Sequence, residues 1–267
     1  MIAVVSPSKT MKEEKVEIET TKPKFIRDTN LLAKDMKKYD VAGLEELMDI
    51  STDLATLNHN RFQEFEKAKK FPAVYLFRGD VFKGIDIDSL KDSEIQYLNK
   101  HLRILSGLYG ALKPLDEIKP YRLEMGTKHE NERGRDLYAF WGNKVKNYLE
   151  KEAEDNILIN LASNEYSKVI LPKEIRMDVY DIEFREKKKD KYPIVAYYAK
   201  VARGEMARYM AVNNVQKVEE LKGFNYSGYA FNEELSEGNT LVFTREQVSC
   251  SGENHLAHDW KTQCLYP

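Results

Sequence analysis

A run of basic residues at helical spacing is the first candidate for chemistry in this sequence. Lys200, Arg203 and Arg208 fall on one face of a helix with about 3.6 residues per turn, and Gly204 lies among them. We expect the apolar side of this helix to pack on a sheet and the three cations to point outward. Such a face can bind phosphates, and a glycine would let a phosphate backbone come close because it has no Cβ. An ordinary amphipathic surface helix would explain the charges equally well.

A second candidate for phosphate binding lies in residues 101–115, HLRILSGLYGALKPL. Their apolar spacing predicts a helix over 92–105, then a turn bracketed by two glycines, then a short apolar piece. This outline is similar to a helix-hairpin-helix element, in which backbone N–H groups of a glycine-rich turn bind phosphate. A plain helix C-cap would also place a glycine there. The residues assigned to this element are Arg103, Ser106, Gly107, Tyr109 and Gly110.

Basic residues also exceed acidic ones between positions 100 and 135, where there are eight Lys or Arg and five Asp or Glu side chains. Arg133 and Arg135 flank a glycine, and Arg122 lies in the same stretch. Planar guanidinium groups match the geometry of phosphate. The whole chain has a formal net charge of −2, so attraction for phosphate must come from such local clusters. A solvated loop is the alternative interpretation.

Two polar segments follow predicted strands, and α/β sheets commonly bind ligands beyond the carboxyl ends of strands. The first follows the apolar run 2–5 and the second follows the run 157–160. The first lacks the glycines and the Gly-Lys-Ser/Thr ending of a Walker A loop, so hydrolysis of nucleoside triphosphates gains no support. Polar turns and helix caps would use the same residue types. The residues of this alternative pocket are Ser6, Lys9, Thr10, Asn160, Ser163, Glu165 and Tyr166.

Metal-type residues gather near the end of the chain, where Cys250, His255, His258 and Cys264 occur. Their spacing is irregular and their surroundings are polar, so we expect no metal site and no cofactor. We expect residues 246–267 to be a disordered or expression-derived tail. No complete catalytic constellation is present, so the sequence leaves open whether the protein is an enzyme.

These candidates must be positioned by the elements that the rest of the chain forms. The chain has 267 residues, 42% of them hydrophobic, which is enough to bury a large core. Apolar runs predict strands at 2–5, 74–77, 157–160, 178–184, 194–198 and 240–243, with helices between most of them. We therefore expect a mixed α/β (α+β) fold with a mixed central sheet and surrounding helices. The N-terminus shows no signal-peptide pattern and no stretch suits a membrane span, so we expect a cytoplasmic protein.

Several ordered segments together resemble the YaaA family of bacterial peroxide stress proteins. The resemblance covers about residues 2–245, which we expect to form a single domain. It implies an unusual topology, a role in limiting oxidative damage by restricting free iron or shielding DNA, and DNA binding through a basic cleft with a helix-hairpin-helix-like element. The segments are 6–10, 78–81, 101–114, 120–126, 133–141, 160–166, 197–208 and 223–231.

The implied partner is double-stranded or structured DNA, and a monomer is the expected state. The family positions that carry over are Lys9, Arg103, Arg122, Lys200, Arg203 and Arg208, with the hairpin at 106–110. If they act together, the basic helix and the hairpin should line one cleft. The alternative is an enzyme that acts on a nucleotide or modified base. A pocket lined by the polar loops would favour the enzyme, whereas an open basic groove would favour the DNA-binding protein.

Overall fold

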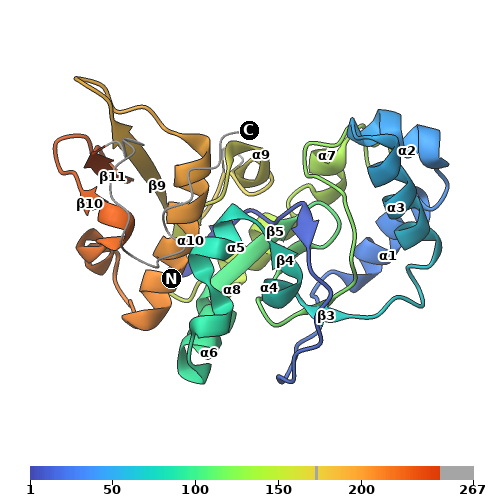
Figure 1. Ribbon diagram of the computed structural model, residues 1–267, viewed down its shortest axis with the longest axis horizontal. Helices are drawn as coiled ribbons and strands as arrows, with labels where there is room; N and C mark the ends of the chain where they lie inside the picture. The colour runs from blue at the N-terminus through green and yellow to red at the C-terminus, as the bar shows by residue number, and fades with distance from the viewer. Residues whose placement is uncertain (172–173, 247–267) are drawn as a thin grey trace, which may run out of the picture.

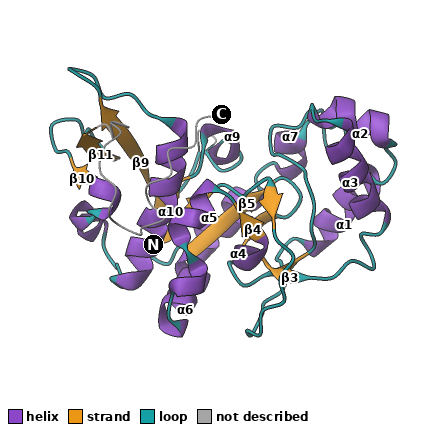
Figure 2. Ribbon diagram, viewed as in Figure 1, coloured by secondary structure: helices purple, strands orange, loops and turns teal. Residues whose placement is uncertain are grey.

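The computed structural model describes residues 1–171 and 174–246. Its centre is a seven-stranded sheet with the order β10-β11-β9-β8-β1-β5-β6. The five strands from β11 to β5 are parallel, and β10 and β6 pair antiparallel with the outer members of this group. Figure 2 shows helices distributed around this sheet. The prediction of a mixed α/β fold with a mixed central sheet is confirmed.

Short apolar, β-branched runs form the central strands, which are buried on both faces as expected of parallel strands covered by helices. Two small sheets, β2 with β4 and β3 with β7, stand beside the main one. The strands are β1 (Ile2–Val5), β2 (Thr10–Met11), β3 (Phe71–Pro72), β4 (Phe77–Arg78), β5 (Leu102–Ser106), β6 (Gly110–Leu112), β7 (Glu117–Ile118), β8 (Ile157–Leu161), β9 (Asp178–Lys187), β10 (Ala230–Phe231) and β11 (Thr240–Glu246).

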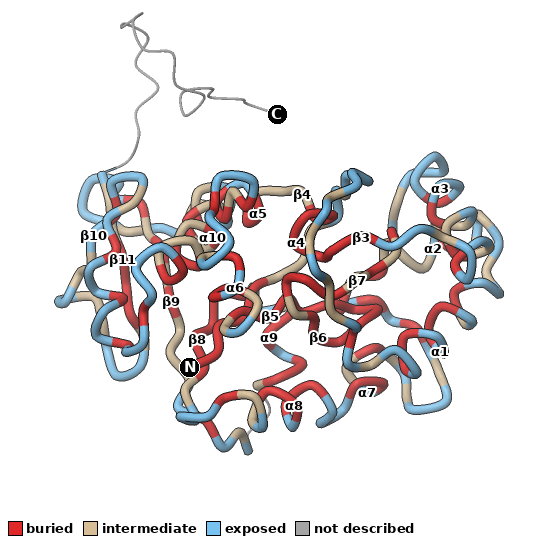
Figure 3. The backbone as a smooth tube through the Cα atoms, turned by 90° about the horizontal axis from the view of Figure 1, so that it is seen from below, coloured by how far each residue is buried: buried red, intermediate tan, exposed pale blue. Residues whose placement is uncertain are grey.

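Helices cover both sides of the sheet, with α5 and α10 on one side and α8 on the other (Figure 3). The α-helices are α1 (Ile26–Met36), α2 (Val41–Met48), α3 (Thr52–Gln63), α4 (Ala73–Leu76), α5 (Asp80–Ile85), α6 (Asp92–His101), α7 (Leu137–Trp141), α8 (Lys144–Glu152), α9 (Asn164–Ser167) and α10 (Ala196–Val212). Three 3₁₀ turns are η1 (Ile87–Ser89), η2 (Val218–Gly223) and η3 (Tyr226–Gly228). None of the helices in the described part of the chain is long and apolar enough to cross a bilayer.

Helices α1, α2 and α3 form one end of the elongated molecule, and β9 to β11 form the other (Figure 1). α2 and α3 are joined by a tight turn, in which Asp49 adopts the left-handed conformation. Asp40 caps the start of α2 and Ser51 caps the start of α3 through their side-chain oxygens. Helices α2 and α3 therefore form a helix–turn–helix unit at this end of the molecule.

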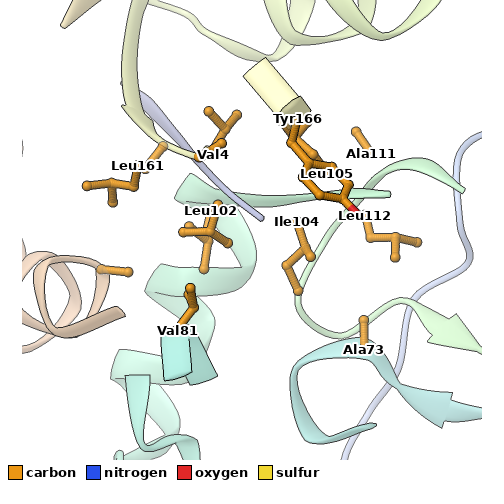
Figure 4. Close-up of a cluster of buried hydrophobic side chains, with 14 of the residues drawn as sticks. Val4, Ala73, Val81, Leu102, Ile104, Leu105, Ala111, Leu112, Leu161 and Tyr166 are labelled. Atoms are coloured by element: carbon orange, nitrogen blue, oxygen red, sulfur yellow. The ribbon is translucent and has the colours of Figure 1, made fainter. Parts of the chain in front are cut away.

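Part of the hydrophobic core lies beside the carboxyl ends of the central strands. Figure 4 shows Val4, Leu161 and Tyr166 close to Leu102 and Leu105, with Val81 of α5 on the opposite side of the group. Val4, Leu105 and Leu161 are fully buried. The polar loops that follow β1 and β8 thus stand on a rigid apolar base, which suits a site that must hold side chains in fixed positions.

The crossing of α5 and α10 depends on two glycines. A Cβ on Gly204 would lie 1.8 Å from the carbonyl oxygen of Val81, and a Cβ on Gly84 would lie 2.1 Å from that of Val201. Both distances are far below any real contact, so the two helix backbones touch directly. The space beside Gly204 is filled by α5, and the hypothesis that it accommodates a phosphate backbone is wrong.

Three predicted elements differ from the structure. Residues 74–77 are largely the helical turn α4, and residues 196–198 already belong to α10, because short apolar runs do not distinguish a buried strand from a buried helical turn. The predicted helix over 92–105 ends at His101, where the chain passes into β5 and pairs with β1. The cysteines and histidines of the predicted tail lie outside the described residues.

Candidate functional site

A cavity of about 1130 Å³ lies at the carboxyl ends of β1 and β8. Its walls come from the loops after these strands, from β9, from the start of α5, from residues 121–124 and from α10. The structure brings together all residues of the alternative polar pocket in its lining, namely Ser6, Lys9, Thr10, Asn160, Ser163, Glu165 and Tyr166. Arg122, Lys200 and Arg203, assigned to DNA contact, line the same cavity.

Hydrogen bonds fix the two strand-end loops to each other. The backbone N–H of Ser163 donates to Oγ of Ser6 at 2.9 Å, and the two serine hydroxyls are 3.2 Å apart. The hydroxyl of Ser8 donates to the carbonyl of Arg78, which ties the first loop to the segment before α5. The cavity walls are thus linked through polar groups rather than through long flexible side chains.

One carboxylate of the cavity is held by an amide. Nδ2 of Asn160 donates to Oδ1 of Asp181 at 2.7 Å, and Oδ1 of Asn160 accepts from the backbone N–H of Ala162 at 3.1 Å. Asn160 and Asp181 are opposite each other in the pairing of β8 with β9. Both the nitrogen and the oxygen of the Asn160 amide are therefore held by hydrogen bonds, and the amide in turn restricts the orientation of the Asp181 carboxylate.

Most charged groups in the cavity wall are already paired with one another. Lys9 and Arg122 both contact Glu124, at 2.7 and 3.0 Å. The other pairs are Lys83 with Asp80 at 3.5 Å, Arg78 with Asp88 at 3.7 Å, and Arg185 with Glu183, whose Nε and Oε2 are 2.8 Å apart. These pairs offset much of one another's charge, although Lys9 and Arg122 share the single carboxylate of Glu124.

Four charged groups of the cavity form no ion pair with any described residue: Lys200 and Arg203 on α10, and Glu165 and Asp181 on the strand-end side. Each carboxylate accepts a hydrogen bond from a neutral donor, Glu165 from the N–H of Gly126 at 2.9 Å and Asp181 from Asn160. The cavity therefore has a cationic side and an acceptor side. A ligand with an anionic group and several N–H or O–H donors would complement both.

The predicted hairpin lies behind the wall of this cavity, where Ser106 contacts Tyr121, and none of its residues lines the cavity. Residues 102–112 form the antiparallel pair β5–β6, in which Ser106 is opposite Gly110. Gly107 accepts a hydrogen bond from the indole of Trp141 at 2.9 Å, and a Cβ on Gly110 would collide with the same indole. Ser106, Gly107, Tyr109 and Gly110 are all buried. The helix-hairpin-helix assignment to this segment is wrong, because pairing with β1 and β6 replaced local helix formation.

Arg103 is buried with 2% of its surface exposed, and its guanidinium is bound within the protein. It contacts Oε2 of Glu152 at 2.7 Å, the hydroxyl of Tyr148 at 3.2 Å and the carbonyl of Leu102 at 2.7 Å. A side chain enclosed in this way cannot reach a DNA backbone. The structure therefore corrects the assignment of Arg103 to DNA contact.

The remaining basic residues of the DNA hypothesis are scattered. Arg208 donates to the carbonyls of Ile85 and Asp86 at 3.1 and 3.0 Å, and Arg133 pairs with Asp28 at 2.7 Å. Arg135 is 93% exposed and lies outside the cavity wall. The expectation that the basic helix and the hairpin line one cleft is therefore wrong, since Lys200 and Arg203 of the helix line the cavity but Arg208 and the hairpin residues do not.

Sequence reasoning gave no role to several residues of the cavity wall. Asp181 and Glu183 were part of a predicted apolar strand, and their alternation with Ile182 and Phe184 was the signal that could have identified a polar face. Arg78 and Asp80 follow a segment that was predicted as a strand. Glu124 and Glu165 also border a second cavity of about 850 Å³, which extends to the end of α2.

Comparisons with known proteins identify the family. A family model described as peroxide stress protein YaaA matches residues 1–235. A UPF0246 protein of Saccharophagus degradans is 44% identical over 256 residues, covering 92% of this chain and 100% of the relative. UPF0246 proteins of Aliivibrio fischeri and Clostridium perfringens are 46% and 44% identical, each over 92% of this chain and 99% and 100% of their own lengths. The chain therefore belongs to the family of peroxide stress protein YaaA.

Proposed function

We propose that this protein is an enzyme of the peroxide stress response that acts on a nucleotide bound in the cavity at the strand ends. The observation that carries the proposal is the division of unpaired charge, with Lys200 and Arg203 on one side and Glu165 and Asp181 on the other. A nucleotide carries phosphate at one end and N–H and O–H donors on its base and sugar. A cavity of about 1130 Å³ also has room for a ligand of this size.

Asp181 is the candidate catalytic group of this site. Its carboxylate is oriented by Asn160, and the fixed geometry of that amide leaves the second carboxylate oxygen for a reacting group. A positioned carboxylate can take a proton from a hydroxyl or a water molecule, and such general base catalysis contributes about 10²- to 10⁴-fold to a rate. We assign this role to Asp181 and a ligand-orienting role to Asn160.

A panel of nucleosides and nucleotides tests the proposal through the melting temperature. A ligand at about 100 times its Kd adds about 2.7 kcal/mol to the free energy of unfolding. For a chain of this length we expect that to raise Tm by roughly 5–10 °C. Asp181→Asn should weaken the bound nucleotide by about 10- to 100-fold, because a charged acceptor is lost. Mass spectrometry of the same mixtures should detect a product with the wild-type protein alone.

Asp178→Asn is the matched control, because Asp178 begins the same strand but is exposed and lies outside the cavity wall. This variant should keep both the nucleotide effect and the product. If no nucleotide changes Tm at millimolar concentration, the cavity is not a nucleotide site and the proposal fails.

A second candidate function is DNA binding, as the family resemblance implies. It is favoured by three lysines exposed at the cavity: Lys9 and Lys83, each with 62% of its side chain exposed, and Lys200. A strand whose phosphates lie on these lysines could deliver a nucleotide into the cavity. The neighbouring cavity beside α2 would receive the continuing strand.

Salt dependence of DNA affinity tests this second candidate. Lys9→Ala and Lys200→Ala together should make the slope of log affinity against log salt shallower by about 1.8 for duplex DNA, at 0.9 per phosphate contact. Arg135→Ala should leave the slope unchanged, because that exposed side chain lies away from the cavity. An unchanged slope in the double variant would place any DNA contact elsewhere.

A further inference from the structure

Arg203 presents a charge that the described protein does not neutralise. Its side chain is half-buried in the cavity wall, and its Nε is buried without a hydrogen-bond partner. Burial lowers the pKa of the guanidinium, and the nearby charge of Glu183 only partly opposes this effect. Glu183 is itself held by Arg185 through a contact of 2.8 Å. The buried Nε lacks an acceptor and Arg203 forms no ion pair with a described residue, so an anion bound in the cavity would supply what this guanidinium lacks.

Lys200 lies one helical turn before Arg203 and borders the same cavity. It is exposed and forms no ion pair with the described residues. Two other carboxylates of the cavity wall are engaged, Glu183 by Arg185 and Asp80 by Lys83. The α10 side of the cavity thus carries two positive charges, Lys200 and Arg203, that form no ion pair with the described residues. Its other wall, formed by α5, is fixed by the direct backbone contact at Gly84 and Gly204, so the two helices cannot separate to admit a bulky group.

We propose that Arg203 and Lys200 form a subsite for the dianion of a terminal phosphate monoester. A monoester carries close to two negative charges at neutral pH, whereas the diester that links nucleotides within a strand carries one. Arg203 supplies a planar guanidinium for two phosphate oxygens, and Lys200 supplies a mobile ammonium at the mouth.

This inference rests on the proposed function and narrows its substrate class. The ligand would be a free nucleoside monophosphate or the phosphorylated end of a strand, rather than an internal nucleotide. The base and sugar would then face Asn160, Glu165 and Asp181, which supply acceptors and one fixed amide.

Calorimetric titration of the full chain tests the subsite with inorganic phosphate and with two nucleotide probes, a nucleoside 5′-monophosphate and its methyl diester. We expect the monoester to bind at least about tenfold more tightly than the diester, because the diester loses one charged contact. Arg203→Met should weaken phosphate and monoester by about 10- to 100-fold while the Tm of the free protein stays the same or rises, because an unpaired buried charge is removed.

Arg208→Met is the matched control on the same helix. It should lower Tm, because the carbonyls of Ile85 and Asp86 lose their donor, but it should keep the phosphate affinity. If Arg203→Met does not fold, Arg203→Lys keeps the charge, loses the planar fork and should bind phosphate about tenfold more weakly. Equal phosphate affinity in the Arg203 variant and the wild type overturns the subsite, and so does equal binding of monoester and diester.

Two further outcomes separate the subsite from the proposed function. If phosphate binding depends on Arg203 but nucleotides bind no more tightly than phosphate, the subsite is supported and the nucleotide function fails. If a nucleoside binds as tightly as its monophosphate, the nucleotide function is supported and the subsite is overturned.

Discussion

Replacing Arg103 with methionine should lower the free energy of unfolding by about 3–5 kcal/mol, the usual effect of removing one partner of a buried ion pair. The substitution removes the buried cation from Glu152, which keeps contacts with only Tyr148 and Lys113, and it removes the guanidinium donor from the carbonyls of Asn99, Lys100 and Leu102. Urea denaturation of the variant and the wild type measures the difference. Arg135→Met controls for the loss of a surface charge and should change stability by less than about 0.5 kcal/mol.

The difference in stability between the wild type and Arg103→Met should also depend on pH. Burial acts to raise the pKa of Glu152, but the hydrogen bond and charge of Arg103 outweigh burial and the pKa is lowered from its usual 4.5. A carboxylate with a depressed pKa stabilises the folded state above its unfolded pKa, and this contribution is lost as pH falls through the folded value. The stability difference between wild type and Arg103→Met should therefore narrow below about pH 4.5. A difference that is constant down to pH 3 would contradict the ion pair as its source.

Gly204→Ala should destabilise the protein, although alanine has the higher helix propensity by about 1 kcal/mol. The added Cβ would meet the carbonyl oxygen of Val81 at 1.8 Å, so α5 and α10 must move apart. Overpacking of this kind typically costs about 1–3 kcal/mol or more, and we expect a net loss of about 2 kcal/mol and a Tm lower by roughly 4–8 °C. Differential scanning calorimetry gives both quantities.

Gly84→Ala provides the test of mechanism, since its Cβ would meet the carbonyl of Val201 in the same crossing. The two substitutions should be less than additive, because the first already separates the helices. Strict additivity would show that the two glycines act independently rather than through one shared crossing, and a Gly204 variant as stable as the wild type would show that the crossing does not require Gly204.

The position of the polar loops could be predicted from the sequence because their signals are local. An apolar run of strand length followed by serine, lysine or asparagine indicates the end of a buried strand, and the loops after Val5 and Leu161 do meet at one cavity. Parallel pairing of β1 with β8 then brings those two ends side by side. Which chemistry the cavity performs stays a prediction.

The hairpin could not be predicted because its conformation is decided by distant residues. Residues 102–105 have the apolar spacing of a helix, but β1 offers them backbone hydrogen bonds about 100 positions away in the sequence. The prediction that the basic side chains point toward a ligand failed for the same reason. Glu152 pairs with Arg103 and Asp28 pairs with Arg133, and two carbonyl oxygens accept hydrogen bonds from Arg208; no local pattern connects these partners to the arginines.

The place of β1 at the middle of the sheet has a consequence for how the chain folds. β1 pairs with β5 on one side and β8 on the other, so its partners are synthesised about 100 and 150 residues after it. At about 5–20 residues per second, synthesis reaches β5 roughly 5–20 s and β8 roughly 8–30 s after this fully apolar strand. Such non-local pairing also slows refolding. The nascent chain therefore exposes an aggregation-prone segment until Leu161 has emerged, and folding of the full chain should respond strongly to chaperones that hold extended apolar segments.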